Sequence, residues 1–176
     1  MMRFIRKRLE NQEGFTLIEL MVVVLIIAIL IAIAIPTFLG ARRRAQDRQA
    51  QSNLRNALTA QKTYYTDPQV YLSDDVPADE TTLEGIESNL DWNNPIARER
   101  GADVTFVGAD GQTLVIQSDS ASGQTFCLGD SAQTGAAGAA GPMATAGTFY
   151  QVIVGGGACP DNTDLGWMVT TDGWNY

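Results

Sequence analysis

Histidine is absent from this chain of 176 residues, and cysteine occurs only as Cys127 and Cys159. The first absence excludes Ser-His-Asp triads, Cys-His dyads and every metal site that uses an imidazole ligand. The two cysteines lie too far apart in sequence for a CxxC redox or zinc motif, and the sequence contains neither a P-loop nor a GxGxxG pattern. The common routes to catalysis and cofactor binding are missing, so we expect neither an enzyme nor a cofactor.

Paired carboxylates remain as a way to perform acid–base chemistry without histidine, as in glycoside hydrolases. The chain has 20 acidic residues, but most of them are interleaved with residues that form loops. That pattern is typical of a solvated acidic surface. A membrane-tethered enzyme or sensor domain is therefore only a distant alternative.

Polar side chains are also absent from Leu20 to Ile35. The wider apolar segment, residues 15–39, exceeds the length of about 20 residues that a helix needs to cross a bilayer. Glu19 lies just inside its start, and a carboxylate costs about 2.5–3.5 kcal/mol at the bilayer centre and less near the edge. Because a carboxylate is costly at this position, we expect Glu19 to have a functional role. Its partner could be the amine of Phe15 in a neighbouring copy, if the chain were cut after Gly14.

The residues Gly14 to Met21, GFTLIELM, follow a short basic leader and run into the apolar segment. They resemble the processing motif of type IV pilins and of the related pseudopilins of type II secretion and DNA uptake. Pro36 matches a helix-kinking proline that is common in this family. The resemblance covers residues 8–66, and beyond them only the architecture is similar.

The resemblance implies a life cycle for the chain. Residues 1–14 would be a leader in the cytoplasm, removed between Gly14 and Phe15 by a membrane prepilin peptidase that also methylates the Phe15 amine. The remainder would be a single-pass protein of the cytoplasmic membrane, held by lipid, with its C-terminal domain outside. An assembly platform and an ATPase would then extract it into a helical homo-oligomeric fibre at the cell surface, with Glu19 needed for assembly.

We therefore expect a structural subunit, the major pilin of a type IV pilus. The alternatives are a pseudopilin of a type II secretion or competence system, or a minor pilin. A disulfide-closed distal loop fits pilins better than secretion-type major pseudopilins, and minor pilins often lose the acidic residue that Glu19 represents. The role of the fibre in adhesion, motility or DNA uptake is not encoded in any motif of this sequence.

Two simpler interpretations of the apolar segment explain less. A secretory signal peptide could use Ala32-Ile33-Ala34 as its cleavage site, but the apolar run is long for such a peptide and Glu19 would interrupt it. A plain membrane anchor explains neither Glu19 nor the Gly14-Phe15 junction.

Charge is strongly segregated along the chain. The positive-inside rule does not choose an orientation, because four basic residues lie on each side of the apolar segment: Arg3, Arg6, Lys7 and Arg8 before it, and Arg42, Arg43, Arg44 and Arg48 after it. From Thr63 onward, the chain contains sixteen acidic residues and only two basic ones, Arg98 and Arg100. This distal part should present an acidic surface, which disfavours a direct nucleic-acid site.

The secondary-structure pattern predicts an α+β fold. One long helix, apolar in its first half (residues 15–39) and amphipathic in its second (residues 40–66), would pack on a C-terminal antiparallel sheet of about four strands. The amphipathic face carries Leu54, Ala57, Leu58, Gln61 and Tyr65. Pro36 should kink this helix without ending it, and Thr66-Asp67-Pro68 should end it.

The remainder divides into an acidic connection, residues 67–101, and a sheet domain, residues 102–176. Leu83, Ile86 and Leu90 are spaced as in a short helix within the connection. Alternating apolar residues and turn signals predict the strands of the sheet domain: Val104–Val107, Thr113–Gln117, Thr125–Leu128 and Phe149–Val154, with a fifth candidate at Met168–Thr170.

Two features of the distal part concern covalent and metal chemistry. Cys127 and Cys159 are expected to form one disulfide in an oxidising compartment and to close the distal loop. Asp161 and Asp164 are weak candidates for calcium ligands, but their spacing fails the EF-hand pattern. Asx residues after a proline are more often turn formers, so we predict no metal site.

Overall fold

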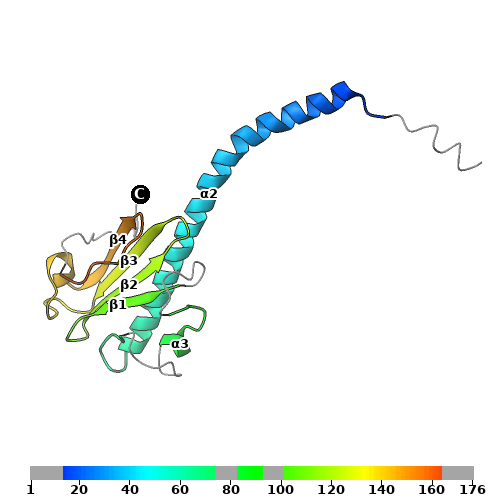
Figure 1. The fold of residues 1–176 in the computed structure, drawn as a ribbon. Coiled ribbons are helices and arrows are strands. Elements are labelled where there is room, and N and C mark those ends of the chain that lie inside the picture. Colours follow the sequence, from blue (N-terminus) through cyan, green and yellow to red (C-terminus); the bar gives the residue numbers. More distant parts are fainter. Residues whose placement is uncertain (1–13, 74–82, 93–100, 164–176) are drawn as a thin grey trace, which may run out of the picture. The chain divides into compact units, whose positions relative to one another are not determined.

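The structure, a computed structural model, describes residues 14–73, 83–92 and 101–163 (Figure 1). The elements follow in the order α2 (Leu17–Tyr65), α3 (Leu83–Ile86), β1 (Asp103–Val107), β2 (Thr113–Asp119), β3 (Gln124–Ser131), the 3₁₀ helix η1 (Gly141–Ala144) and β4 (Gly147–Val154). The chain divides into two compact units, Met1–Ala41 and Arg42–Tyr176. The α+β class predicted from the sequence is confirmed.

In the first unit, α2 presents apolar side chains to its surroundings on every side. Residues 14–39 are all exposed, and the helix has an apolar window with a mean hydropathy of 3.3, of which none is buried. Among the described residues, α2 alone is long and apolar enough to cross a membrane. A helix that is apolar all round must be covered by lipid or by other protein helices.

Pro36 lies inside α2 and does not end it, as the sequence predicted. Proline lacks the N–H that the helix ladder requires, so one hydrogen bond is missing at this turn. The neighbouring Thr37 donates its hydroxyl to the carbonyl of Ile33 over 3.2 Å. Such side-chain bonds to the preceding turn often accompany a bend, and the kink itself stays a prediction.

In the second unit, α2 buries one face against the sheet (Figure 1). Leu54, Ala57 and Gln61 of the predicted stripe are buried, whereas Leu58 and Tyr65 are partly buried. Gln61 is a polar side chain in this interface, and both ends of its amide are satisfied. Its Nε2 donates to the Leu72 carbonyl over 2.8 Å, and its Oε1 accepts from the Leu72 N–H over 3.0 Å.

The sheet is an antiparallel meander in the order β1-β2-β3-β4. Side chains alternate between its two faces, as the period of two along a strand requires. One face turns Leu114, Ile116, Phe126 and Leu128 toward α2. The other face turns Val115, Cys127 and Phe149 toward a second cluster that includes Met143.

The disulfide between Cys127 and Cys159 is confirmed, with a Cα–Cα distance of 5.7 Å. It attaches the chain after β4 to the face of the sheet opposite α2, since Cys127 belongs to the second cluster. The predicted fifth strand at Met168–Thr170 lies outside the described residues.

The strand bounds differ from the predicted ones: β1 begins at Asp103, β2 continues to Asp119 and β4 begins at Gly147. β3 extends past the predicted end at Leu128 to Ser131, where its residues pair with β2 and β4 and the Asp130 side chain is bonded to three other segments. The short helix ends at Ile86, so Leu90, though buried, reaches the core from a turn and not from the helix.

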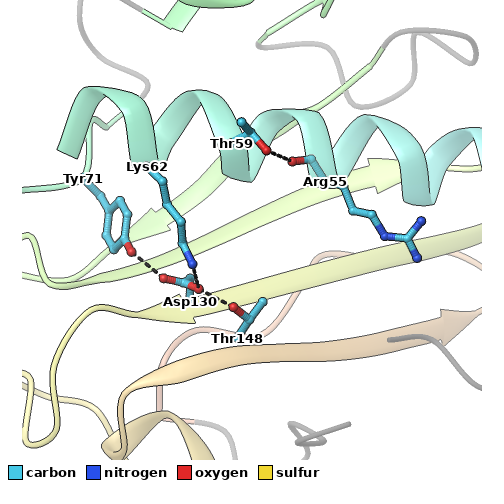
Figure 2. Close-up of polar contacts among 6 residues, drawn as sticks. All are labelled: Arg55, Thr59, Lys62, Tyr71, Asp130 and Thr148. Carbon is cyan, nitrogen blue, oxygen red and sulfur yellow. Dashed lines mark hydrogen bonds and ion pairs between the residues drawn. The ribbon is translucent and has the colours of Figure 1, made fainter. Parts of the chain in front are cut away.

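Asp130 is the polar centre of the second unit (Figure 2). Its side chain is 3% exposed, and its Oδ1 lies 3.0 Å from the ammonium of Lys62 on α2. The same oxygen accepts a hydrogen bond of 2.6 Å from the Thr148 hydroxyl on β4, and Oδ2 accepts one from the Tyr71 hydroxyl. Burial and this carboxylate together raise the pKa of Tyr71. One carboxylate therefore joins the helix, the segment after it and two strands.

The opposite end of the sheet is tied to α2 by a second carboxylate. Asp47 Oδ1 accepts hydrogen bonds from the hydroxyls of Ser120, over 2.7 Å, and of Ser122. These serines belong to the turn between β2 and β3. The helix and the sheet are thus fixed at both ends by polar contacts, with the apolar core between them.

We predict unequal effects from removing the two charges of the Asp130 cluster. Lys62 is half exposed, so solvent screens its side of the ion pair, but Lys62→Met leaves the buried Asp130 carboxylate without its cation and should cost about 1–2 kcal/mol of unfolding free energy. Asp130→Ala leaves the hydroxyls of Tyr71 and Thr148 without their acceptor and should cost about 2–4 kcal/mol. Thermal unfolding of the detergent-solubilised chain measures both, and equal losses would contradict this assignment.

A second prediction concerns the turn between β1 and β2. Gly111 has a φ of +69°, and a Cβ added there would lie 2.6 Å from the Cβ of Val70. Gly111→Ala therefore combines backbone strain with a collision and should cost about 2–4 kcal/mol of unfolding free energy.

Gly123→Ala is the matched control for this collision. Gly123 also has a positive φ, +91°, but nothing lies within 4 Å of an added Cβ. It should cost only the strain, about 1 kcal/mol. If both variants unfold at the same temperature, the collision with Val70 does not contribute to the loss of stability.

Candidate processing and assembly site

The candidate site is the segment that leads into α2. The helix begins at Leu17, so Gly14, Phe15 and Thr16 precede it in a non-helical conformation. Phe15 is 91% exposed, and nothing lies within 4 Å of the position that a Cβ would take at Gly14. The peptide bond between Gly14 and Phe15 is therefore outside the helix and open to another protein.

Thr16 and Glu19 close the start of the helix together. The carbonyl of Thr16 accepts the first helical hydrogen bond, from the Leu20 N–H, and the Thr16 hydroxyl accepts from the Glu19 N–H over 3.3 Å. In return, Glu19 Oε2 accepts from the Thr16 N–H over 2.9 Å and from the Thr16 hydroxyl over 2.6 Å. This is a capping box, which satisfies two backbone donors that a helix start otherwise leaves free.

Sequence reasoning identified Glu19 but missed Thr16. The signal was available, because Thr-x-x-Glu directly before an apolar run is the pattern of a capping box. The apolar length of the segment and the apparent cost of the carboxylate drew attention to Glu19 alone.

The two oxygens of Glu19 have different surroundings. Both bonds from Thr16 fall on Oε2, and within the described residues no donor reaches Oε1. A carboxylate can accept about four hydrogen bonds. Glu19 can therefore hold the helix start with one oxygen and bind an ammonium group with the other.

Pro36 is not close to this site in the sequence and lies inside α2. Cys127 and Cys159 lie in the second unit, where their role is to hold the distal loop.

Asp161, one of the two weak calcium candidates, is a turn residue. Its Oδ1 accepts hydrogen bonds from the hydroxyl of Thr163, over 2.5 Å, and from the Thr163 N–H, over 2.9 Å. The hydroxyl first and the N–H second hold the pKa of the Asp161 carboxyl below its usual value. Asp164 lies outside the described residues, and those residues contain no group of three acidic, histidine or cysteine side chains suited to a metal ion.

The first comparison with known proteins concerns the N-terminal segment. Residues 10–35 match the family description "Prokaryotic N-terminal methylation motif". This match covers Gly14, Phe15, Thr16 and Glu19, so it includes both the open peptide bond and the capping box. No solved structure matches the chain significantly.

Three curated proteins illustrate the wider similarity. The chain is 38% identical over 85 residues to "Type IV wide pilus major component PilA4" of Thermus thermophilus, which covers 48% of this chain and 65% of that protein. It is 34% identical over 82 residues to "Type II secretion system core protein G" of Vibrio cholerae, covering 47% and 51%. It is 33% identical over 113 residues to "Fimbrial protein EcpC" of Eikenella corrodens, covering 60% and 74%.

The extent of these matches differs between relatives. The chain spans less than two thirds of the Thermus and Vibrio proteins but nearly three quarters of the Eikenella fimbrial protein. The similarity therefore extends well past the N-terminal motif. The chain belongs to the family of type IV pilins and type II secretion pseudopilins.

Proposed function

We propose that this chain is the precursor of the major structural subunit of a type IV pilus-like fibre. It is cut between Gly14 and Phe15 and then assembles with other copies of itself. The observation that carries this proposal is the arrangement at the start of α2. An exposed, non-helical cleavage bond lies five residues before a carboxylate that keeps one oxygen open.

Before assembly, the precursor lies in the cytoplasmic membrane. The apolar half of α2 is long enough to cross it, and its exposed side chains are covered there by lipid. The capping box keeps the first polar groups of the helix bonded within the chain, which lowers the cost of placing them at the membrane edge. The second unit lies outside the cell, where its disulfide is stable.

Cleavage creates the group that Glu19 requires. The new amine of Phe15 is a cation next to the capping box, at the depth of Glu19 in a parallel neighbour. Pairing that amine with Glu19 Oε1 of another copy neutralises two charges in a setting with little screening. This contact fixes the axial position of an incoming subunit, while the apolar helices exchange lipid for each other.

The partners that follow from this function are a prepilin peptidase, an inner-membrane assembly platform and its ATPase. They are proposed from the family and from the open Gly14-Phe15 bond. From Thr63 onward the chain has sixteen acidic residues and two arginines, so nucleic acid is not among the proposed direct partners.

A pseudopilin of a type II secretion system is the second candidate. The observation in its favour is the similarity to the Vibrio secretion protein over 82 residues. The confirmed disulfide between Cys127 and Cys159 supports a pilin instead, because a covalently closed loop suits a fibre exposed to the medium. Electron microscopy of sheared fibres, with mass spectrometry of their main component, distinguishes a long pilus from a short pseudopilus and a major from a minor subunit.

We predict that the mature protein begins at Phe15. The bond before it is exposed and lies ahead of the apolar segment, whereas a signal peptidase would cut after such a segment. Intact mass and N-terminal sequencing of fibre protein should show the loss of residues 1–14 and a methylated amine. A mature chain that begins at Ile35 would contradict this proposal, because it would indicate cleavage by a signal peptidase.

We also predict that Glu19→Ala abolishes fibres but permits cleavage. The variant loses both the cap and the charge, so processed protein should accumulate in the membrane fraction. Glu19→Asp should retain partial assembly, because the charge persists on a shorter side chain. The measurement is the ratio of sheared fibre protein to processed membrane protein.

Glu19→Gln separates the two roles of this side chain. Glutamine also serves in a capping box, so the helix start is retained while the negative charge is lost. If pairing with the Phe15 amine drives assembly, this variant should fail like Glu19→Ala. Normal fibres from Glu19→Gln would show that the cap, and not the charge, is what assembly needs.

A further inference from the structure

The second unit carries opposite charges at its two ends. Four arginines occupy its first helical turns: Arg42, Arg43, Arg44 and Arg48, here called the basic end. They are all exposed, and no described acidic residue forms an ion pair with them. Asp47 lies among them but is already bonded to the hydroxyls of Ser120 and Ser122.

The basic end lies where the helix is least covered by its own sheet. Ala50 is the first buried residue of α2. Arg44 and Arg48 are four positions apart and therefore share one side of the helix. Lys62, eighteen positions after Arg44, falls on the same side, and its ammonium is already paired with Asp130. On this side of α2, Lys62 forms an ion pair with a carboxylate of its own chain, whereas Arg44 and Arg48 form none with the residues that the structure describes.

The acidic end lies past the last turn of α2. It consists of Asp67, just beyond the helix, and Glu84 on α3, which lies beside the C-terminal end of α2 (Figure 1). Both residues are exposed, and neither forms an ion pair with a described residue. The helix rise places Arg44 about 32 Å from Tyr65, where α2 ends. The two charged ends are therefore far apart and cannot neutralise each other within one copy.

Each copy thus has cations at one end and anions at the other that form no ion pair with any residue the structure describes. We infer that these ends dock head to tail, with Arg44 and Arg48 of one copy against Asp67 and Glu84 of the next. The inference rests on the proposed fibre. Copies that leave one membrane share one orientation, so an antiparallel pair is excluded. A heterologous contact between parallel copies leaves a basic end exposed at one terminus of the row and an acidic end exposed at the other. Further copies can therefore add, and an open filament results.

The whole-chain charge supports a second copy as the occupant. The net charge of the chain is −8, so copies packed closely repel each other unless their few cations are placed against acidic surfaces. Six of the cations lie between Ala41 and Lys62, and Lys62 is used internally. The four exposed arginines at the basic end can offset that repulsion.

The test neutralises the basic end in the full-length chain. Arg44→Gln with Arg48→Gln should reduce sheared fibre protein about five- to tenfold relative to processed membrane protein. The matched control is Asn56→Glu with Thr63→Glu, which changes the net charge by the same −2 at exposed positions that are neither three nor four residues from Arg44 or Arg48. The control should assemble like the unaltered chain.

A charge swap provides the positive test. Arg44→Glu with Arg48→Glu should block assembly, and adding Asp67→Lys with Glu84→Lys should restore fibres, because the complementary ends are exchanged and the net charge returns to its original value. Failure of the swap to restore fibres would overturn the inference, as would equal yields from the neutralised chain and its control. Loss of the neutralised chain from the membrane fraction would assign the arginines to lipid headgroups instead, which also overturns it.

The unaltered chain separates this inference from the proposed function. If it makes no fibres, the proposed function is wrong and the docking inference is wrong with it. If it makes fibres and the neutralised chain makes as many, only the docking inference is wrong.

Discussion

The exposed apolar surface of the first unit is the constraint on which the behaviour of this protein depends. From Phe15 to Leu39 every side chain is exposed, and most are large and apolar. Exposure of apolar surface to water costs about 25 cal/mol per Å², so this helix is strongly disfavoured in water. Lipid and the same helix of other copies are the two environments that can cover it, and they are similar enough in polarity for the protein to pass from one to the other.

That similarity explains why polar groups control the passage. Moving an apolar helix from lipid to a bundle of helices gains little hydrophobic free energy, because neither environment contains water. Direction and register must come from other interactions. Glu19 offers one in the first unit, through the oxygen that Thr16 does not use. The charged ends of the second unit offer another, outside the membrane, where solvent and salt weaken it.

The second unit has a core of its own. Its core lies between α2 and one face of the sheet, and two buried or half-buried carboxylates, Asp47 and Asp130, fix the ends of that interface. These polar contacts and the core together define the packing of α2 on the sheet.

Much of this architecture followed from periodicity. The apolar run, the amphipathic stripe and the alternating strands each have a period that identifies one element, and all three were predicted in place. The extension of β3 through Asp130 could not be predicted in this way. Gly, Asp and Ser favour loops locally, whereas here they pair with β2 and β4, and Asp130 makes side-chain contacts with Lys62, Tyr71 and Thr148. Met143 shows the same limit, since a Gly/Ala-rich surrounding gave no sign that it is fully buried.

The segment between β3 and β4, residues 132–146, is attached mainly through its backbone. Gly135 N–H donates to the Ala144 carbonyl within the segment, and Ala140 N–H donates to the Asn162 carbonyl, close in sequence to the disulfide at Cys159. These bonds do not depend on the exposed side chains of the segment, in which Ala136 and Met143 are buried. Substitution of these exposed side chains can therefore alter the chemistry that the surface shows to its environment without removing the bonds that hold the segment.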